Sequence, residues 1–199
     1  MIKSILVDLG GVYFTDGTRS AIEKISKKFN LDPNKVKEIT DNDVSHAYRK
    51  SQITSEEYWN QSKRFLGINA DNSELNDLWI GSYDPQEKVI GILRKLKAKG
   101  IKLFFFSNNV KERAEFLERK YKIKEFFIDG IYSHIVQKSK REGNEIFKLG
   151  LEKTGDKPEE VVVIDDKEEY ANKAKQLGMH GIWFRNPEQL EEELNKLIR

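Results

Sequence analysis

The chain has 199 residues, of which 38% are hydrophobic and 34% charged, and its formal net charge is +2. This length suits one ordinary domain, or one domain with a modest insertion, and is sufficient for a buried core. The small net charge offers no general attraction for nucleic acid, and the absence of cysteine excludes disulfides, thiolate catalysis and zinc–thiolate sites. The first residues run directly into Asp8 without a signal peptide, and no apolar run approaches the length of a membrane span. We therefore expect a cytoplasmic protein that binds neither nucleic acid nor membrane.

Five short apolar runs, rich in Ile, Val and Phe, predict strands. Most of them lack polar alternation, which is typical of strands buried on both faces of a parallel sheet. Helical periodicity separates the later runs. The predicted strands are residues 2–7, 101–106, 127–132, 161–164 and 181–184, and the predicted helices are residues 86–99, 111–121, 144–154, 168–177 and 187–198. This alternation predicts a doubly wound α/β fold.

Between about residue 15 and residue 84 the apolar spacing is helical, and no strand is evident. Thr18 and Ser55 are predicted to cap two helices, Pro33 to begin a third, and residues 72–83 to form a fourth. Asp84-Pro85 is a natural point of return to the sheet, because the residue before a proline favours extended backbone. We expect a small all-helical insert, residues 15–84, and a core of residues 1–14 and 85–199.

Polar residues follow the predicted strands, at the sheet edge where open α/β folds bind ligands. They are Asp8, Gly10 and Gly11 after the first strand, Ser107 and Asn108 after the second, Lys138 and Lys140 near the third, and Asp165 and Asp166 after the fourth. Asp8 and Asp166 could hold a hard divalent cation such as magnesium. A hydroxyl, an amide and a lysine could receive phosphate oxygens, and one carboxylate could attack phosphorus.

These segments resemble the four motifs of the haloacid dehalogenase (HAD) superfamily, whose members have a Rossmann-like core and often a helical cap after the first strand. The matching residues are Asp8-Leu9-Gly10-Gly11-Val12, Ser107-Asn108, Lys140 with Ile146-Phe147, and Asp165-Asp166 with Ala174 and Leu177-Gly178. The resemblance covers the predicted core, and its Asp-Leu-Gly-x-Val pattern is similar to a branch that includes small sugar-phosphate phosphatases.

The resemblance implies roles for the matching residues. Asp8 would be the nucleophile and, with the carbonyl of Gly10 and the carboxylate of Asp166, a magnesium ligand. Asp165 would lie in or beside the metal shell. The transferring group would be bound by Ser107 and Lys140, with Asn108 and Gly11 as further substrate-binding candidates.

Gly10 departs from the family pattern. Typical family phosphatases have a second Asp at this position, which acts as general acid and base and is worth ~10²–10⁴-fold in rate. Gly10 is also a candidate for a backbone conformation that other residues avoid.

Three further positions depart from the pattern. Arg141 follows Lys140 where proline is usual, and Phe147 lies one residue farther along than the family spacing, so Lys138 stays an alternative to Lys140. Tyr170 stands where Asn or Asp usually supports the metal site.

The sequence predicts a magnesium-dependent, phosphatase-type hydrolase that acts on a small phosphorylated metabolite through an aspartyl-phosphate. Two alternatives stay open: a metal-independent haloacid dehalogenase and a non-catalytic relative that binds a ligand or partner. The Asp165-Asp166 pair argues against the dehalogenase, because clustered carboxylates without a metal repel an anionic substrate. The oligomeric state is left open.

Three residues of the predicted insert, His46, Tyr48 and Arg49, are candidates to face the active site. The favoured interpretation places them on a solvent-exposed helix surface.

Overall fold

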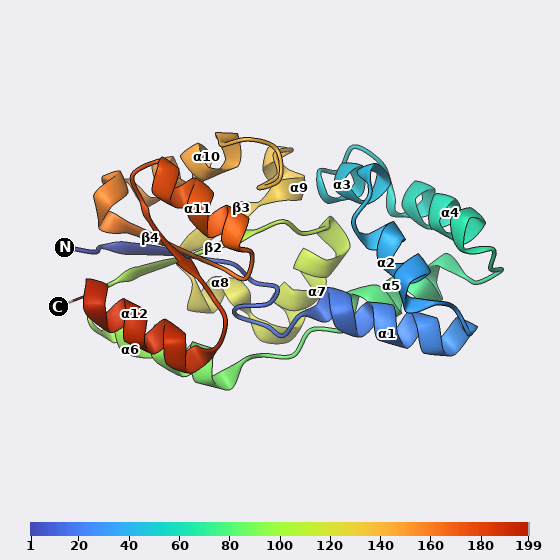
Figure 1. The fold of residues 1–199 in the computed structure, drawn as a ribbon, viewed down its shortest axis with the longest axis horizontal. Coiled ribbons are helices and arrows are strands. Elements are labelled where there is room, and N and C mark those ends of the chain that lie inside the picture. The colour runs from blue at the N-terminus through green and yellow to red at the C-terminus, as the bar shows by residue number, and fades with distance from the viewer. Residues whose placement is uncertain (199) are drawn as a thin grey trace.

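A fully parallel sheet of five strands forms the centre of the larger part of the computed structural model, which describes residues 1–198 (Figure 1). The strands are β1 (Ser4–Val7), β2 (Lys102–Ser107), β3 (Asp129–Tyr132), β4 (Val161–Asp165) and β5 (His180–Trp183). Their order is β3-β2-β1-β4-β5, so β1 lies in the middle, with Val7 opposite both Phe105 and Ile164. The segments that follow β1, β2 and β4 are therefore neighbours at one edge of the sheet.

Helices cover both faces of this sheet (Figure 1). We call the sheet together with these helices the sheet unit. They are α6 (Glu87–Ala98), α7 (Lys111–Tyr121), α8 (Ile123–Phe126), α9 (Ser133–Val136), α10 (Glu145–Thr154), α11 (Glu168–Gln176) and α12 (Pro187–Leu197), with a 3₁₀ turn at Pro158–Glu160. Successive side chains of a strand point to opposite faces. Leu6 accordingly packs in one apolar cluster with Phe147 of α10, while Ile5 packs in another with Leu93 of α6 and Leu190 of α12.

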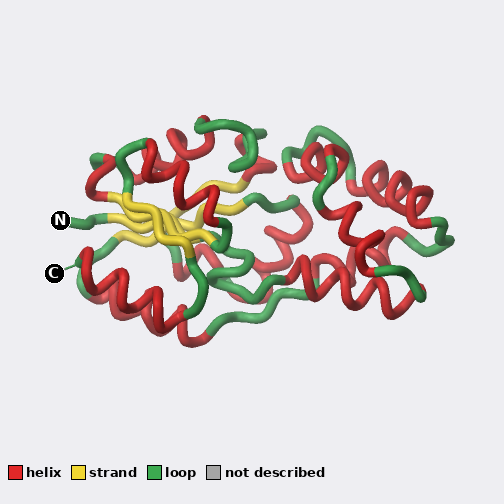
Figure 2. The backbone as a smooth tube through the Cα atoms, viewed as in Figure 1, coloured by secondary structure: helices red, strands yellow, loops and turns green. Residues whose placement is uncertain are grey.

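Five further helices lie beside the sheet unit rather than on a face of the sheet (Figures 1 and 2). This helical unit consists of α1 (Gly17–Phe29), α2 (Pro33–Thr40), α3 (Asp43–Arg49), α4 (Ser55–Leu66) and α5 (Asn72–Ile80). It buries its own apolar cluster, in which the rings of Trp59 and Trp79 meet edge to face with centroids 6.1 Å apart. Val110 of the sheet unit joins that cluster.

The two segments that connect the units run side by side. Phe14 and Pro85 form an antiparallel bridge, and the Thr15 N–H donates to the Asp84 carbonyl at 2.8 Å. The side-chain amide of Gln86 donates to the Phe14 carbonyl at 3.1 Å. The chain thus leaves and re-enters the sheet unit at neighbouring points.

The predicted α/β fold is confirmed, with differences in detail. Asp16, not Thr18, caps α1 by accepting from the Arg19 N–H at 3.1 Å. Thr54, not Ser55, caps α4, because its hydroxyl accepts from the Glu57 N–H in a reciprocal capping box.

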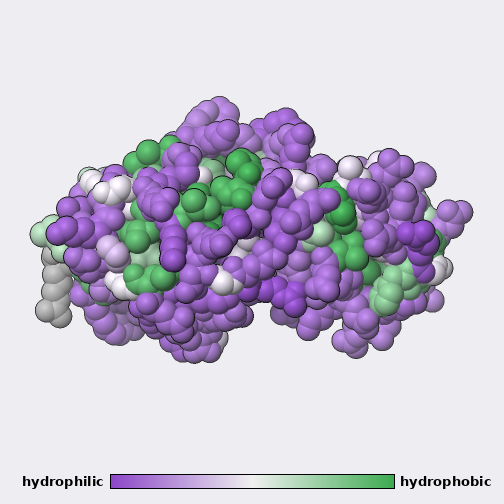
Figure 3. All heavy atoms as spheres, turned by 90° about the horizontal axis from the view of Figure 1, so that it is seen from above, coloured by the Kyte–Doolittle hydropathy of each residue, from purple (hydrophilic) through white to green (hydrophobic). Residues whose placement is uncertain are grey.

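Other differences concern the short elements. The helix predicted over residues 72–83 ends at Ile80, and α8 and α9 were not predicted. The division at residues 14/15 and 84/85 stays a prediction. In the range 1–198 no helix has both the length and the apolarity needed to cross a membrane. The face shown in Figure 3 is largely hydrophilic, with separate hydrophobic areas on the two units.

Candidate active site

Carboxylates from two neighbouring strand ends meet at one edge of the sheet. Asp8 directly follows β1, and its N–H donates to the Ile164 carbonyl of β4 at 2.9 Å. Single carboxylate oxygens of Asp8, Asp165 and Asp166 lie within 4.8 Å of one another. Ser107, the last residue of β2, is buried and lines the same cavity. The structure therefore brings together the acidic and hydroxyl groups that the sequence placed at this edge.

Lys140 enters this cluster from the loop between α9 and α10. Its ammonium lies 2.6 Å from Oδ2 of Asp165 and 3.1 Å from Oδ1 of Asp8, and the side chain is 1% exposed. Lys138 instead lies at the surface, where it pairs with Glu145 at 2.5 Å. Of the two candidate lysines, Lys140 is the one at the carboxylates.

A network of hydrogen bonds fixes the Lys140 loop. The side-chain carbonyl of Asn108 accepts from the Lys140 N–H at 3.1 Å, and its amide donates to the Ser139 hydroxyl at 3.1 Å. The Lys173 ammonium, which the sequence analysis did not identify, donates to the Lys140 carbonyl at 2.9 Å. The Asn108 side chain is thus engaged in placing the lysine.

The two glycines after Asp8 are tightly packed for different reasons. Gly11 has a φ of 83°, and a Cβ there would lie 2.5 Å from Oδ2 of Asp166. A positive φ of this size is left-handed backbone, which favours glycine. Gly10 does not have a positive φ, so the unusual backbone predicted for Gly10 belongs to Gly11 instead. A Cβ on Gly10 would lie 3.3 Å from the Tyr83 ring. Tyr83 therefore crowds the place where family phosphatases have their second Asp.

Burial and mutual repulsion shape the charges of the cluster. Burial raises the pKa of Asp8 to about 8, although the Lys140 ammonium opposes this shift. Burial and the charge of Asp165 raise the pKa of Asp166 to about 6. For Lys140, burial lowers the pKa, but the two carboxylates outweigh it and hold the pKa above its ordinary value. Two carboxylates thus contact one buried ammonium, and a third carboxylate lies beside them in the same poorly solvated site.

The arrangement of donor atoms fits a hard divalent cation. Oδ2 of Asp165 contacts Lys140, and its Oδ1 accepts from the Lys167 N–H at 2.9 Å. On Asp8, both the Leu9 N–H and Lys140 contact Oδ1. Oδ2 of Asp8 and the carboxylate of Asp166 are consequently available to a metal. Magnesium prefers such a small set of carboxylate oxygens.

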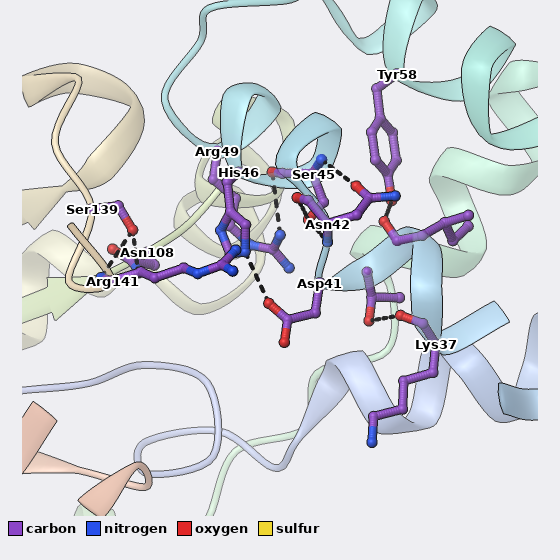
Figure 4. Close-up of polar contacts among 12 residues, drawn as sticks. Lys37, Asp41, Asn42, Ser45, His46, Arg49, Tyr58, Asn108, Ser139 and Arg141 are labelled. Atoms are coloured by element: carbon purple, nitrogen blue, oxygen red, sulfur yellow. Dashed lines mark hydrogen bonds and ion pairs between the residues drawn. The ribbon is translucent and has the colours of Figure 1, made fainter. Parts of the chain in front are cut away.

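A cavity of about 530 Å³ opens over the cluster, where the sheet edge faces the helical unit. His46 and Arg49 of α3 line it, so for these two the favoured surface interpretation is wrong (Figure 4). Tyr48 is buried, stacks on Tyr58 with centroids 4.7 Å apart, and donates to Glu112. It does not line the cavity, and its burial makes the surface interpretation wrong for Tyr48 as well.

Tyr170 also lines the cavity, in place of the Asn or Asp expected there. Its ring packs near the ammonium groups of Lys140, Lys167 and Lys173, at 5.9, 5.5 and 5.4 Å from the ring centroid. The ring offers these cations a π face instead of an oxygen.

The chain matches a known family along most of its length. The sequence model of a hydrolase family, the haloacid dehalogenase-like hydrolases, matches residues 2–178. No curated protein sequence matches this chain.

Several solved structures share the fold. A HAD-like family hydrolase from Porphyromonas gingivalis superimposes with a TM-score of 0.78 at 22% identity, covering 100% of this chain and 98% of that one. A HAD family enzyme from Bacteroides thetaiotaomicron, in complex with magnesium and inorganic phosphate, has a TM-score of 0.71 at 23% identity, covering 90% of this chain and 92% of that one. L-2-haloacid dehalogenase from Xanthobacter autotrophicus has a TM-score of 0.63 at 18% identity, covering 98% of this chain and 83% of that one. At these identities the likeness is one of fold.

Proposed function

Because the chain belongs to the haloacid dehalogenase-like hydrolase family, we propose that it is a magnesium-dependent phosphatase of small phosphorylated metabolites, with Asp8 as the nucleophile. The observation that carries this proposal is the buried contact of Lys140 with Asp8 and Asp165, beside Asp166 and at the floor of a cavity. A carboxylate cluster that needs a cation suits a phosphate substrate better than attack on a halogenated carbon without metal.

One carboxylate oxygen of Asp8 is the attacking atom, and the other would remain for the metal. Its bond to phosphorus forms as the bond from phosphorus to the leaving oxygen breaks, and the leaving oxygen takes up a proton. Lys140 and Ser107 stabilise the charge on the remaining phosphoryl oxygens. Water then hydrolyses the aspartyl-phosphate, which releases inorganic phosphate and regenerates Asp8.

The metal and the helical unit complete the proposal. Magnesium held by Asp8, Asp166 and the Gly10 carbonyl would neutralise negative charge and polarise the phosphoryl group. We assign the helical unit the role of a cap that limits water at the cavity and contacts the substrate. Because Gly10 supplies no carboxylate, substrates whose leaving groups need little protonation fit best.

Turnover of a generic aryl phosphate tests the proposal. We expect hydrolysis with magnesium, loss of hydrolysis in excess chelator, and recovery when magnesium is restored. Lys138→Gln, two residues from Lys140 but at the surface, is the control and should retain full turnover. Full hydrolysis in excess chelator would contradict the proposal, and halide release from chloroacetate under the same conditions would favour a dehalogenase.

A further inference from the structure

Two arginines line the cavity without a carboxylate partner. Arg49 ends α3 in the helical unit and is half-buried, whereas Arg113 lies on α7 of the sheet unit and is 2% exposed. Within residues 1–198, Arg19 pairs with the carboxylate of Glu23. Neither Arg49 nor Arg113 has a carboxylate oxygen within 4.0 Å of its guanidinium group in the same range. A buried charge without a counter-charge is unfavourable, so this pair stands out.

The neutral contacts of Arg113 leave it incompletely satisfied. Its terminal nitrogens donate to the Trp79 carbonyl at 3.2 Å and to the side chain of Asn109 at 3.4 Å. The Nε–H is buried and has no acceptor among the described residues. The guanidinium also lies over the rings of Trp79 and Tyr83, at 4.8 and 4.5 Å from their centroids. Aromatic faces compensate a cation only in part.

Arg49 adds a second positive charge at the same place. Its guanidinium lies 5.8 Å from the centroid of the Trp79 ring, so both arginines pack against one indole. Burial lowers the pKa of Arg113, and the charge of Arg49 lowers it further. An anion bound between two like charges would relieve this repulsion.

The surroundings of Arg49 are also basic. Figure 4 shows His46 and Arg141 extending toward the space beside Arg49, with Lys37 farther along the helical unit. Asp41 is the carboxylate in this view, and it is already engaged by Nε2 of His46 at 2.9 Å. Burial lowers the pKa of His46, and the charges of Arg49 and Arg141 lower it further. The space beside Arg49 is therefore surrounded mainly by basic side chains, whereas Asp8 and Asp166 line the cavity at the sheet edge.

We propose that Arg49 and Arg113 bind a second anionic group of the substrate, a carboxylate or a phosphate, while its transferring phosphate lies at Asp8. This inference rests on the proposed function and deepens it, since it narrows the substrate class to phosphate esters that carry another anion. The planar guanidinium suits this task because it can donate two parallel hydrogen bonds to such a group.

The test uses matched phosphate esters. Each phosphate ester that carries a carboxylate is paired with the corresponding neutral carboxamide, and the spacer between the two groups varies along the series. A parallel series carries a second phosphate in place of the carboxylate. With magnesium, we expect the wild type to prefer an anionic member over its neutral partner by about 10- to 100-fold in kcat/KM, mainly through KM. The series that shows the larger preference identifies the second group as carboxylate or phosphate.

Variants then assign the preference to the arginines. Arg49→Gln should reduce the ratio of anionic to neutral kcat/KM to near one, whereas Arg64→Gln, an exposed arginine of α4, should leave the ratio intact. Arg113→Gln should reduce the ratio as well, and Arg113→Lys should retain part of it. If Arg113→Gln lowers kcat/KM equally for every ester and also lowers the Tm, Arg113 only supports Trp79. That result would overturn the role of Arg113 in binding the second anion.

Failure of this inference is distinguishable from failure of the phosphatase proposal. Hydrolysis of anionic and neutral partners at equal rates over all spacers overturns the second anion site and leaves the phosphatase intact. If no ester is hydrolysed, the phosphatase proposal fails, and calorimetric binding of the same phosphorylated carboxylates decides the site. Equal affinity for the wild type and Arg49→Gln then overturns it.

Discussion

The crowded carboxylates predict that Asp8→Asn abolishes turnover and yet stabilises the magnesium-free protein. Asparagine is nearly the same size and can still accept from the Leu9 N–H through its side-chain oxygen. Lys140 keeps its contact with Asp165 at 2.6 Å, so no buried cation is left unpaired. The substitution removes one of the three negative charges that compete for that lysine.

The size of the effect follows from the pKa of Asp8. A carboxyl group whose pKa is raised by folding destabilises the folded state above its unfolded pKa, and the penalty grows until the folded pKa is reached. Folding raises the pKa of Asp8 from 3.8 to about 8, so the penalty develops between those two values. At pH 7 the interval is roughly three units, and at ~1.4 kcal/mol per unit the upper limit is ~4 kcal/mol. The pKa of about 8 already includes the Asp8–Lys140 attraction, and burial of the polar asparagine amide in the same site reduces the expected gain to about 1–3 kcal/mol.

Thermal denaturation at pH 5 and pH 8, with chelator or with saturating magnesium, measures this effect. In chelator the wild type should lose more stability than Asp8→Asn from pH 5 to pH 8, and the loss that remains in the variant reflects the raised pKa of Asp166. At ~2–4 °C per kcal/mol, the variant should melt several degrees higher at pH 8. Magnesium should stabilise the wild type more than the variant.

A surface carboxylate provides the control. Asp129 pairs with Lys153 at 2.6 Å, and this hydrogen bond lowers the pKa of Asp129. A lowered carboxyl pKa contributes stability that is present above the unfolded pKa, near 4. Asp129→Asn should therefore lose a small amount of stability, and the loss should be equal at pH 5 and pH 8. The reasoning is refuted if Asp8→Asn is less stable than the wild type at pH 8 in chelator, or if both proteins show the same dependence on pH.

Two further predictions concern the same edge of the sheet. Lys140→Met leaves Asp165 buried without its cation and should lower the free energy of unfolding by about 3–5 kcal/mol in urea denaturation, so a variant as stable as the wild type would contradict the buried pair. Because Gly10 provides no proton donor, kcat should fall as the leaving group becomes more basic, with aryl and acyl phosphates ahead of primary alkyl phosphates. Gly10→Asp should favour alkyl phosphates if the Tyr83 ring yields by a few tenths of an ångström, and a flat dependence on leaving-group basicity in the wild type would show that another residue donates the proton.

The central strands β1, β2 and β4 were predictable because they are almost entirely buried and read as nearly continuous apolar runs. The shortest helices were not, since α8 and α9 have four residues each, too few for a clear apolar stripe. The caps of α1 and α4 were misplaced by one or two residues, because Asp, Ser and Thr are all good caps and only geometry selects among them.

The candidate site was predictable where its residues follow strands directly, as Asp8 and Asp166 do. The choice between Lys138 and Lys140 could not be made from the sequence, because it depends on a loop that Asn108 and Lys173 hold from two other elements. Arg113 offered a local signal that was missed.

That signal is the position of Arg113 on α7. It shares a helix face with Leu117, four residues on, which is fully buried in the apolar core. An arginine at such a position has to satisfy its charge inside the protein.

The pairing of Thr15 with Asp84 has a consequence for how this protein can be rebuilt. A segment whose two ends are held together places few demands on the length or shape of the chain between them. Joining Phe14 to Pro85 through a tight turn would leave every strand register untouched, and a different helical hairpin or a small sheet could be grafted at the same two residues. Under the proposed function, the nucleophile would stay in the sheet unit, and an exchanged insert would change the contacts that the substrate meets at the cavity.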